Sequence, residues 1–246
     1  MNSNQNAIEI KGLTKRYRDL VAVDNLNLSI KRGELFSLLG VNGAGKSTTI
    51  KMLSCLISPD EGDADILGSS ILTSPIQVKA NIGVSPLETA VAANLSVREN
   101  LELICKVHSF SKDKSKERIE RLAHLLSIDK VLTKRANKLS GGYSRRLSIA
   151  MALICEPKVL FLDEPTLGLD VLARSELWDV IKALKGEVTI ILTTHYMEEA
   201  EALSDRIAIM KDGKILLCDT SESIKSSTQT KSIEEAFIKI VKEAKE

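Results

Sequence analysis

Eight consecutive residues early in the chain have the types and spacing of a loop that binds phosphate groups. They match the pattern G-x-x-x-x-G-K-[ST] and run Gly40, Val41, Asn42, Gly43, Ala44, Gly45, Lys46 and Ser47, with Thr48 next. Glycines let backbone N–H groups approach anionic oxygens, and a helix that begins here adds the positive end of its dipole. Lys46 would then face the β- and γ-phosphates of a nucleotide, and the hydroxyl group of Ser47 would bind Mg²⁺. The alternative, a Gly-rich turn that arose by chance, is disfavoured by the apolar run before the loop and the helical pattern after it.

Two carboxylates follow directly after a second apolar run. The run is 159–162, and Asp163 and Glu164 come next. In a doubly wound sheet, ligands bind at the carboxyl ends of the strands, which would bring both acids to Lys46 and Ser47. Asp163 would hold Mg²⁺, directly or through water, and Glu164 would polarise the water that attacks the γ-phosphate. The alternative interpretation is a solvated acidic strand end.

A histidine follows the third apolar run. The run is 188–192, and His195 comes three residues later. A lone histidine is more often structural, but the carboxyl end of a strand in the same sheet favours contact with the γ-phosphate and the catalytic water.

A second helix start also has the composition of an anion site. Ser140, Gly141 and Gly142 precede a helical pattern, and the dipole argument applies to them as it does to the first loop. The alternative is an ordinary helix cap. If both helix starts bind phosphate, one phosphate tail cannot easily reach both within a single subunit.

The elements that would position these residues alternate between apolar runs and helical segments, which favours an α/β sheet. A half-buried strand over 26–30 and a buried strand over 35–39 precede the phosphate loop. Asp212-Gly213 separates two late apolar runs and predicts a hairpin. Residues 95–156 carry few strand signals and are predicted to form a helical subdomain inserted into the α/β core.

One helix start is marked by a capping box. Ser96 with Glu99 opens a helix that is expected to carry Leu101, Ile104, Val107 and His108 on one side.

Near the end of the chain, residues 221–230 are Ser/Thr-rich and are predicted to form a loop. Ser232 with Glu235 then opens a last helix, whose apolar stripe is expected to pack on the domain rather than on a membrane.

Composition excludes several classes of protein. The chain has 246 residues, 43% of them hydrophobic and 27% charged, as a globular domain does. Its net charge of +1 gives no general support for nucleic-acid binding. No apolar run is long enough to span a bilayer, and no secretory signal is evident. The four cysteines are too widely spaced for a disulfide framework or a metal pair, so buried thiols in a reducing cytosol are expected.

Taken together, these motifs resemble the nucleotide-binding subunit of ATP-binding-cassette (ABC) transporters over about residues 7 to 220. By this resemblance, 139–142 corresponds to the family's signature sequence, with Tyr143 in place of the common Gln. Asp170 belongs to the D-loop, His195 is the switch histidine, and Tyr17 is the aromatic residue that stacks on adenine.

The resemblance implies a P-loop NTPase fold of ABC type, with a mixed sheet core, an antiparallel β subdomain and an inserted helical subdomain. The chain is expected to form a single ABC ATPase domain, 1–246. Its parts are an α/β core with the β subdomain (1–94 and 157–220), the helical subdomain (95–156), and a C-terminal loop and helix (221–246).

The resemblance also accounts for the second anion site. Two subunits face each other head to tail, so that Ser140 and Gly142 of one bind the γ-phosphate that Lys46 of the other holds. ATP joins the subunits and hydrolysis separates them, which can drive a conformational change in an attached membrane protein.

One position departs from the family. Leu87 stands where a glutamine is expected that binds Mg²⁺, helps to place the water and reports the nucleotide state to the membrane partner. Leucine has neither donor nor acceptor. The expectation is slow or poorly coupled hydrolysis, unless Ser85, Glu88 or a water fills the gap.

The function expected from the sequence is therefore an ATPase subunit, using ATP and Mg²⁺, that powers transport by a separate transmembrane permease. It is expected to be a homodimer, peripheral on the cytoplasmic face of the cell membrane, and to resemble bacterial exporters more than importers. One alternative is a nucleotide-gated regulatory subunit with weak turnover owing to Leu87. Another is an ABC-type ATPase that acts on nucleic acid or ribosomes, which the net charge of +1 disfavours.

Overall fold

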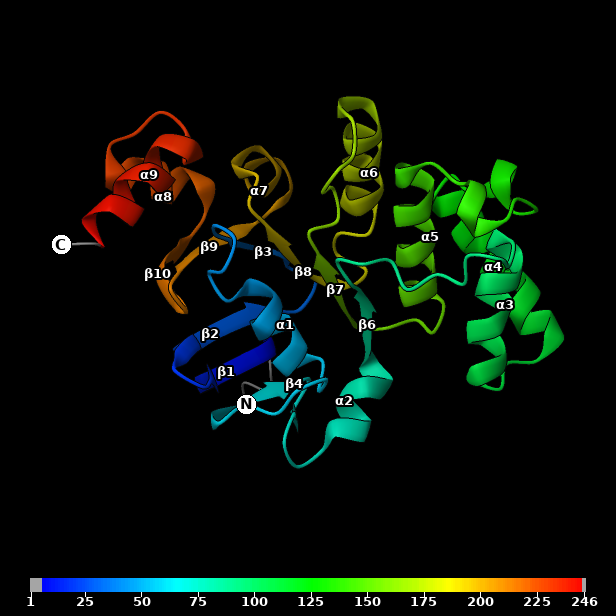
Figure 1. The fold of residues 1–246 in the computed structure, drawn as a ribbon, viewed down its shortest axis with the longest axis horizontal. Coiled ribbons are helices and arrows are strands. Elements are labelled where there is room, and N and C mark those ends of the chain that lie inside the picture. Colours follow the sequence, from blue (N-terminus) through cyan, green and yellow to red (C-terminus); the bar gives the residue numbers. More distant parts are fainter. Residues whose placement is uncertain (1–5, 245–246) are drawn as a thin grey trace.

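The protein is built on two β-sheets that share one buried core, and the computed structural model describes residues 6–244. The larger sheet has the strand order β10-β9-β3-β8-β7-β6 (Figure 1). All its neighbouring strands pair in parallel except β9 and β10, so the predicted mixed sheet is confirmed. In chain order its strands are β3 (Leu35–Leu39), β6 (Ile82–Ser85), β7 (Val159–Asp163), β8 (Thr189–Thr194), β9 (Arg206–Lys211) and β10 (Lys214–Asp219).

The smaller sheet is antiparallel and has the order β2-β1-β4-β5. Helix α1 lies between the two sheets, because Ile50 and Leu53 share one buried cluster with Ile8 of β1 and Phe36 of β3. The expected antiparallel β subdomain is therefore present. Its elements and the two nearby helices are β1 (Asn6–Tyr17), β2 (Leu20–Lys31), α1 (Lys46–Leu53), β4 (Glu61–Ile66), β5 (Ser69–Ser70) and α2 (Pro75–Asn81).

The segment between β6 and β7 is helical, as predicted. Its elements are α3 (Val97–Val107), α4 (Lys112–Leu125), two short 3-10 helices (Asp129–Val131 and Ala136–Lys138) and α5 (Gly141–Leu153). The capping box of Ser96 and Glu99 is present in both directions and begins α3. Along the predicted side of this helix the burial falls toward the end: Leu101 is fully buried, while Val107 is 70% exposed.

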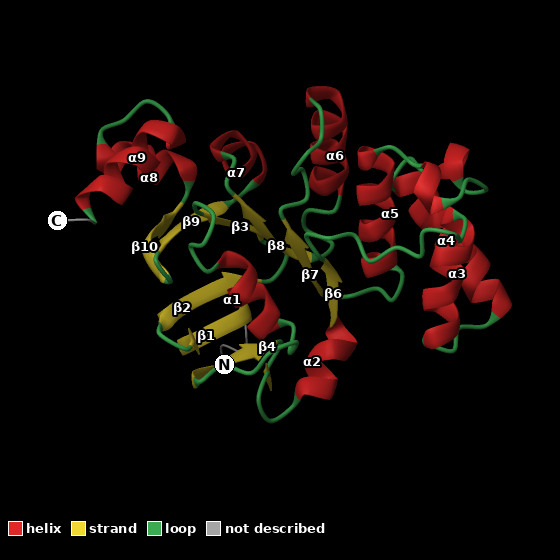
Figure 2. Cartoon of the chain, in the orientation of Figure 1, coloured by secondary structure: helices red, strands yellow, loops and turns green. Residues whose placement is uncertain are grey.

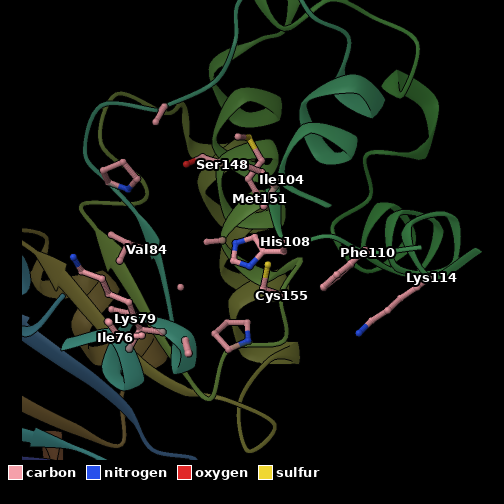
Figure 3. Close-up of a pocket in the computed structure, with 17 residues that line it drawn as sticks. Ile76, Lys79, Val84, Ile104, His108, Phe110, Lys114, Ser148, Met151 and Cys155 are labelled. Atoms are coloured by element: carbon pink, nitrogen blue, oxygen red, sulfur yellow. The ribbon is translucent and has the colours of Figure 1, made fainter. Parts of the chain in front are cut away.

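A groove of about 670 Å³ separates the helical subdomain from α2 and β6 (Figure 3). Ile76 and Lys79 of α2 line one side, and His108, Lys114 and Met151 line the other. Most of the residues that line the groove are apolar, and Lys79 and Lys114 add positive charge.

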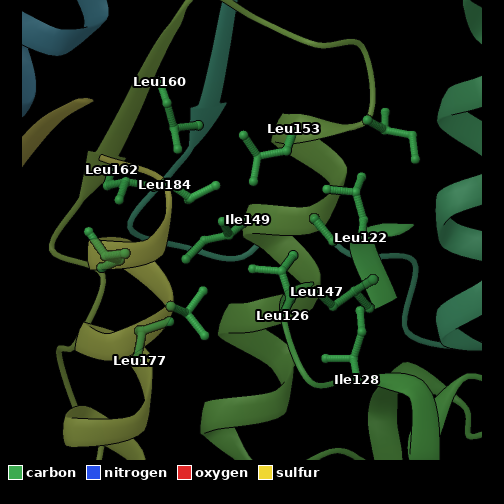
Figure 4. Packing of buried hydrophobic residues seen from close by; sticks show 14 of the residues in the cluster. Leu122, Leu126, Ile128, Leu147, Ile149, Leu153, Leu160, Leu162, Leu177 and Leu184 are labelled. Atoms are coloured by element: carbon green, nitrogen blue, oxygen red, sulfur yellow. The ribbon is translucent and has the colours of Figure 1, made fainter. Parts of the chain in front are cut away.

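Helix α5 joins the helical subdomain to the larger sheet. Its apolar side chains Leu147, Ile149 and Leu153 pack between Leu122 of α4 and the sheet residue Leu160 (Figure 4). Helices α6 (Val171–Ala183) and α7 (Met197–Leu203) follow β7 and β8.

The end of the described chain forms two helices rather than a loop and a helix (Figure 2). Residues 221–230 were expected to be a loop, but α8 spans Ser221–Thr228. The side chain of Thr220 accepts a hydrogen bond from Ser223 N, and Ile224 is fully buried, so tertiary packing outweighs the modest helix propensity of serine and threonine.

The last helix, α9 (Ile233–Glu243), packs on the domain as predicted. Ser232 caps it, but the Glu235 side chain accepts from Lys231 N rather than completing the expected capping box.

All four cysteines are free thiols, as expected, although only Cys105 is buried and the others are partly exposed. Within residues 6–244, no helix is both long enough and apolar enough to cross a membrane.

Candidate active site

The Gly-rich loop lies at the carboxyl end of β3 and leads into α1, in the strand–loop–helix order that phosphate binding requires. Its backbone is packed closely against two other strands. A Cβ atom on Gly40 would lie 2.4 Å from Met210 O, and one on Gly45 would lie 2.3 Å from Ala22 O. Gly45 also has a φ of 104°, which other residues rarely adopt. Glycine is thus required here by the surroundings of the loop as well as by its ligand.

Lys46 is held at the mouth of this loop. Only 5% of the residue is exposed, and its Nζ donates to the carbonyl oxygens of Gly40 at 2.7 Å and Val41 at 3.2 Å. The same Nζ lies 3.2 Å from Glu164 Oε1, in a buried ion pair. The charge is therefore already desolvated and positioned for an incoming anion.

Ser47 and Asp163 meet as the sequence predicted. Ser47 Oγ donates to Asp163 Oδ1 at 3.0 Å, and Thr193 Oγ1 donates to the same oxygen at 2.5 Å. Hydroxyl and carboxylate oxygens are the ligands that Mg²⁺ prefers, so this pair fits the metal. No group of three or more His, Cys, Asp or Glu in the described part of the chain could hold a metal. Mg²⁺ at this position would complete its coordination with phosphate oxygens and water.

Glu164 is enclosed between a lysine and a histidine. Its Oε2 lies 2.7 Å from Nδ1 of His195, its Oε1 faces Lys46, and only 6% of the residue is exposed. Its backbone N–H donates to Thr193 Oγ1 at 3.0 Å, and its φ of 49° lies in the left-handed region. Such a conformation costs free energy and persists at sites where the side chain must be aimed.

Lys46, Ser47, Glu164 and His195 line one cavity of about 460 Å³, whereas Asp163 does not line it but contacts Ser47, which does. Tyr17, which is 46% exposed, and Leu87, which is 40% exposed, both line the cavity. Neither Ser85 nor Glu88 lines the cavity; Ser85 instead hydrogen-bonds to Ser148. The cavity is lined by Tyr17, Leu20, Ala22, Asn42, Gly43, Ala44, Gly45, Lys46, Ser47, Thr48, Leu87, Glu164, Leu167 and His195.

The second predicted anion site lies elsewhere. Ser140, Gly141 and Gly142 begin α5 and do not line the cavity. They lie against the D-loop and α6: a Cβ on Gly141 would lie 3.3 Å from the Leu169 side chain. Asp170 caps α6 by accepting from Ala173 N at 2.9 Å. Within one chain the two Gly-rich helix starts do not meet at a common ligand.

Two contributors to the site were not found from the sequence. Thr193 is one, and its place between Leu192 and Thr194 at a strand end is the only signal it carries. Arg145 is the other: its guanidinium donates to the carbonyls of Pro86 at 2.7 Å and Leu87 at 2.9 Å, although nearly sixty residues separate them. Burial lowers the pKa of Arg145. This arginine ties the signature helix α5 to the segment that carries Leu87.

Comparison with known proteins places the fold and the loop in one family. The family model described as ABC transporter matches residues 23–167. The chain is 39% identical over 223 residues to the daunorubicin resistance ATP-binding protein DrrA3 of Streptomyces coeruleorubidus. The aligned region covers 90% of this chain and 71% of that protein. It is 40% identical over 222 residues to the phospholipid-transporting ATPase ABCA3 of Homo sapiens, covering 89% of this chain but only 13% of that protein.

Solved structures agree with this relationship. An ATP-binding subunit of an ABC transporter superposes with a TM-score of 0.85 at 27% identity and covers 96% of this chain and 99% of its own. A dimeric ATP-binding cassette in a post-hydrolysis state, bound to ADP and Pi, gives a TM-score of 0.79 at 27% identity, covering 87% and 98% respectively.

Proposed function

Because the chain belongs to the ABC transporter family as one of its ATP-binding subunits, we propose that it powers a separate membrane permease through ATP-dependent, head-to-tail pairing of two copies. One observation carries this proposal. The phosphate loop and the signature helix start have the same anion-binding chemistry, yet only the first lines the cavity. A second copy, turned head to tail, supplies the missing helix start to each cavity.

The side chains of the cavity then divide the work of ATP hydrolysis. Phosphate oxygens attract Lys46 more strongly than one carboxylate does, so nucleotide binding draws its ammonium group away from Glu164. The freed Glu164 accepts a proton from water as the water oxygen bonds to the γ-phosphorus and the bond to the β–γ bridging oxygen breaks. His195 holds the other oxygen of Glu164 in place. Mg²⁺, held by Ser47 and Asp163 when bound, neutralises charge on the phosphates.

Tyr17 is the proposed base-stacking residue, since its aromatic ring lines the cavity and is half exposed. Ser140 and Gly142 would bind the γ-phosphate across the interface, next to Asp170 of the D-loop.

The groove between α2 and α3 is the proposed contact for the permease. Ile76 on its edge is 79% exposed, and Lys79 and Lys114 flank it, so it suits a short helix with one apolar face and acidic flanks (Figure 3). Pro86, whose carbonyl binds Arg145, also lines the groove. Movement of the docked helix would therefore reach Leu87 in the cavity directly. The complex would place the chain on the cytoplasmic face of a membrane.

Export is the proposed direction, since relatives include the daunorubicin/doxorubicin resistance ATP-binding protein DrrA of Streptomyces peucetius, 39% identical over 222 residues.

The second candidate function is a nucleotide-gated regulatory subunit with weak turnover. Leu87 is the observation that favours it, because the cavity has an apolar side chain where polar work is expected.

The pairing is tested with Glu164→Gln, which keeps the shape of the side chain but cannot accept the proton. We expect this variant to elute as a dimer at millimolar ATP and as a monomer without nucleotide in size-exclusion chromatography with light scattering. The double variant Glu164→Gln/Ser140→Arg is the matched control, and it should bind ATP while remaining monomeric. A Glu164→Gln protein that binds ATP but stays monomeric would falsify the proposal.

A further inference from the structure

A glutamate outside the nucleotide cavity is completely enclosed by protein. Glu199 lies in α7 and has 0% exposure. Its Oε1 accepts a hydrogen bond from Nε1 of Trp178 in α6 at 3.1 Å. Its Oε2 has no hydrogen-bond partner among residues 6–244. A carboxylate with one hydrogen bond is costly in such surroundings, and burial raises the pKa of Glu199.

Two hydroxyl groups approach the same carboxyl group. Thr166 lies two residues after Glu164, and Thr194 directly precedes His195. Their effect on the pKa of Glu199 is downward but smaller than that of burial. Thr166 Oγ1 is itself buried and has no hydrogen-bond partner within the described chain. A neutral carboxyl group suits this set, because its O–H can donate to Thr166 while its other oxygen accepts from α6.

The charged groups around α7 act on Glu199 in both directions. Glu164, at the end of β7, raises the pKa of Glu199 further. Arg145 of α5 is a cation that interacts with Glu199, but its guanidinium already donates to two backbone carbonyls. His195 is paired with Glu164, and Arg174 of α6 lies against the ring of Tyr196. The strands β3 and β8 are uncharged, and α9 meets α7 through apolar side chains.

We propose that Glu199 is a positioning residue which, as a neutral carboxylic acid, ties α6 to the two segments that carry Glu164 and His195. Through Thr166 it holds the segment that leads from Glu164 to the D-loop. Through Thr194 it holds the end of β8, from which the histidine extends. The acid thereby fixes both ends of the 2.7 Å contact between Glu164 and His195. The kinetic part of this inference rests on the proposed function, whereas the protonation state does not.

The protonation state is tested by stability against pH, with Glu199→Gln as a neutral mimic of the same shape. A carboxyl group with a raised pKa binds more protons in the folded state than in the unfolded state, so the wild type loses stability as pH rises above the ordinary glutamate value. Glu199→Gln has no such loss. We expect its Tm, relative to wild type, to rise by about 3 °C or more between about pH 5 and about pH 8.

The matched control is Glu198→Gln, an exposed glutamate of the same helix, whose Tm relative to wild type should not change with pH. A Glu199→Gln protein whose Tm relative to wild type stays constant or falls over the same range would show that folding does not favour the protonated acid, and the inference would be wrong. This readout needs no catalysis, so it decides the matter even if the chain hydrolyses no ATP.

The positioning role is tested by kcat. Glu199→Ala should lower kcat for ATP by about tenfold with little change in KM, because substrate does not touch this residue. Glu199→Gln should recover most of that loss, and its kcat should persist at alkaline pH where that of the wild type declines. Equal kcat for the alanine variant and wild type, or no recovery with glutamine, overturns the positioning role.

Discussion

The two Gly-rich helix starts of this chain share small residues but have very different surroundings. The phosphate loop is enclosed: Lys46 is 5% exposed and has two carbonyls and a carboxylate as partners. The signature start is open: Ser140 is exposed, and its Oγ accepts one long hydrogen bond, of 3.5 Å, from Tyr143 N. A region whose polar groups are satisfied within the chain is a complete half-site. A region that leaves them exposed is accessible to a ligand, as the proposed pairing of two copies requires.

The most direct test of how the two regions work together is to damage each of them in a different molecule. Lys46→Met and Ser140→Arg each damage one half-site, and each variant alone should lose about 100-fold or more in ATPase rate. A mixed dimer contains one cavity in which both regions are intact. We therefore expect an equimolar mixture to recover a substantial part of wild-type activity, measured as phosphate release. A mixture as inactive as either variant alone would show that the two regions do not act across an interface.

The enclosed region is also the one that sequence predicts well. Its candidate functional residues lie at strand ends on the same edge of one sheet, so Lys46, Asp163, Glu164 and His195 could be placed together from strand ends alone. The side chains that support them could not. Arg145 binds carbonyls far away in sequence, and nothing local marks the residue as their partner.

The same reasoning explains the errors in the fold. Helix α8 forms because Ile224 is buried in a cluster with α7, β9 and α9, which is a tertiary effect on a segment with weak helix propensity. By contrast, the apolar alternation of Ile8 and Ile10 was present in the sequence and predicts the buried face of β1, although the strand was not identified there.

Within the enclosed region, Leu87 is the residue to test next. It lines the cavity but has no polar atom at the position where a glutamine is expected. Leu87→Gln should raise kcat several-fold, about what one recovered hydrogen bond contributes. Leu87→Met, of similar size and equally apolar, is the control and should leave the low rate in place. Equal rates for wild type and Leu87→Gln at saturating Mg-ATP would reject this explanation and leave a water or another group in the role of the glutamine.

The smallest predicted effect is a change in Tm, and it is tested on two serines that both cap helices. Ser96 caps α3 in a reciprocal capping box, with Glu99 Oε2 accepting from Ser96 N at 2.7 Å, whereas the hydrogen bond of Ser140 has no such reciprocal partner. Ser96→Ala should therefore cost about 1 kcal/mol of stability, seen as a Tm lower by about 2–4 °C, with ATPase activity retained. Ser140→Ala should change the Tm less and the ATPase rate more, because its hydroxyl group is available to a phosphate of the opposite subunit. Each variant serves as the control for the other in thermal unfolding and in phosphate release. If Ser140→Ala lowered the Tm as much as Ser96→Ala and left the ATPase rate unchanged, Ser140 would be an ordinary helix cap. That result would contradict phosphate binding at the signature start.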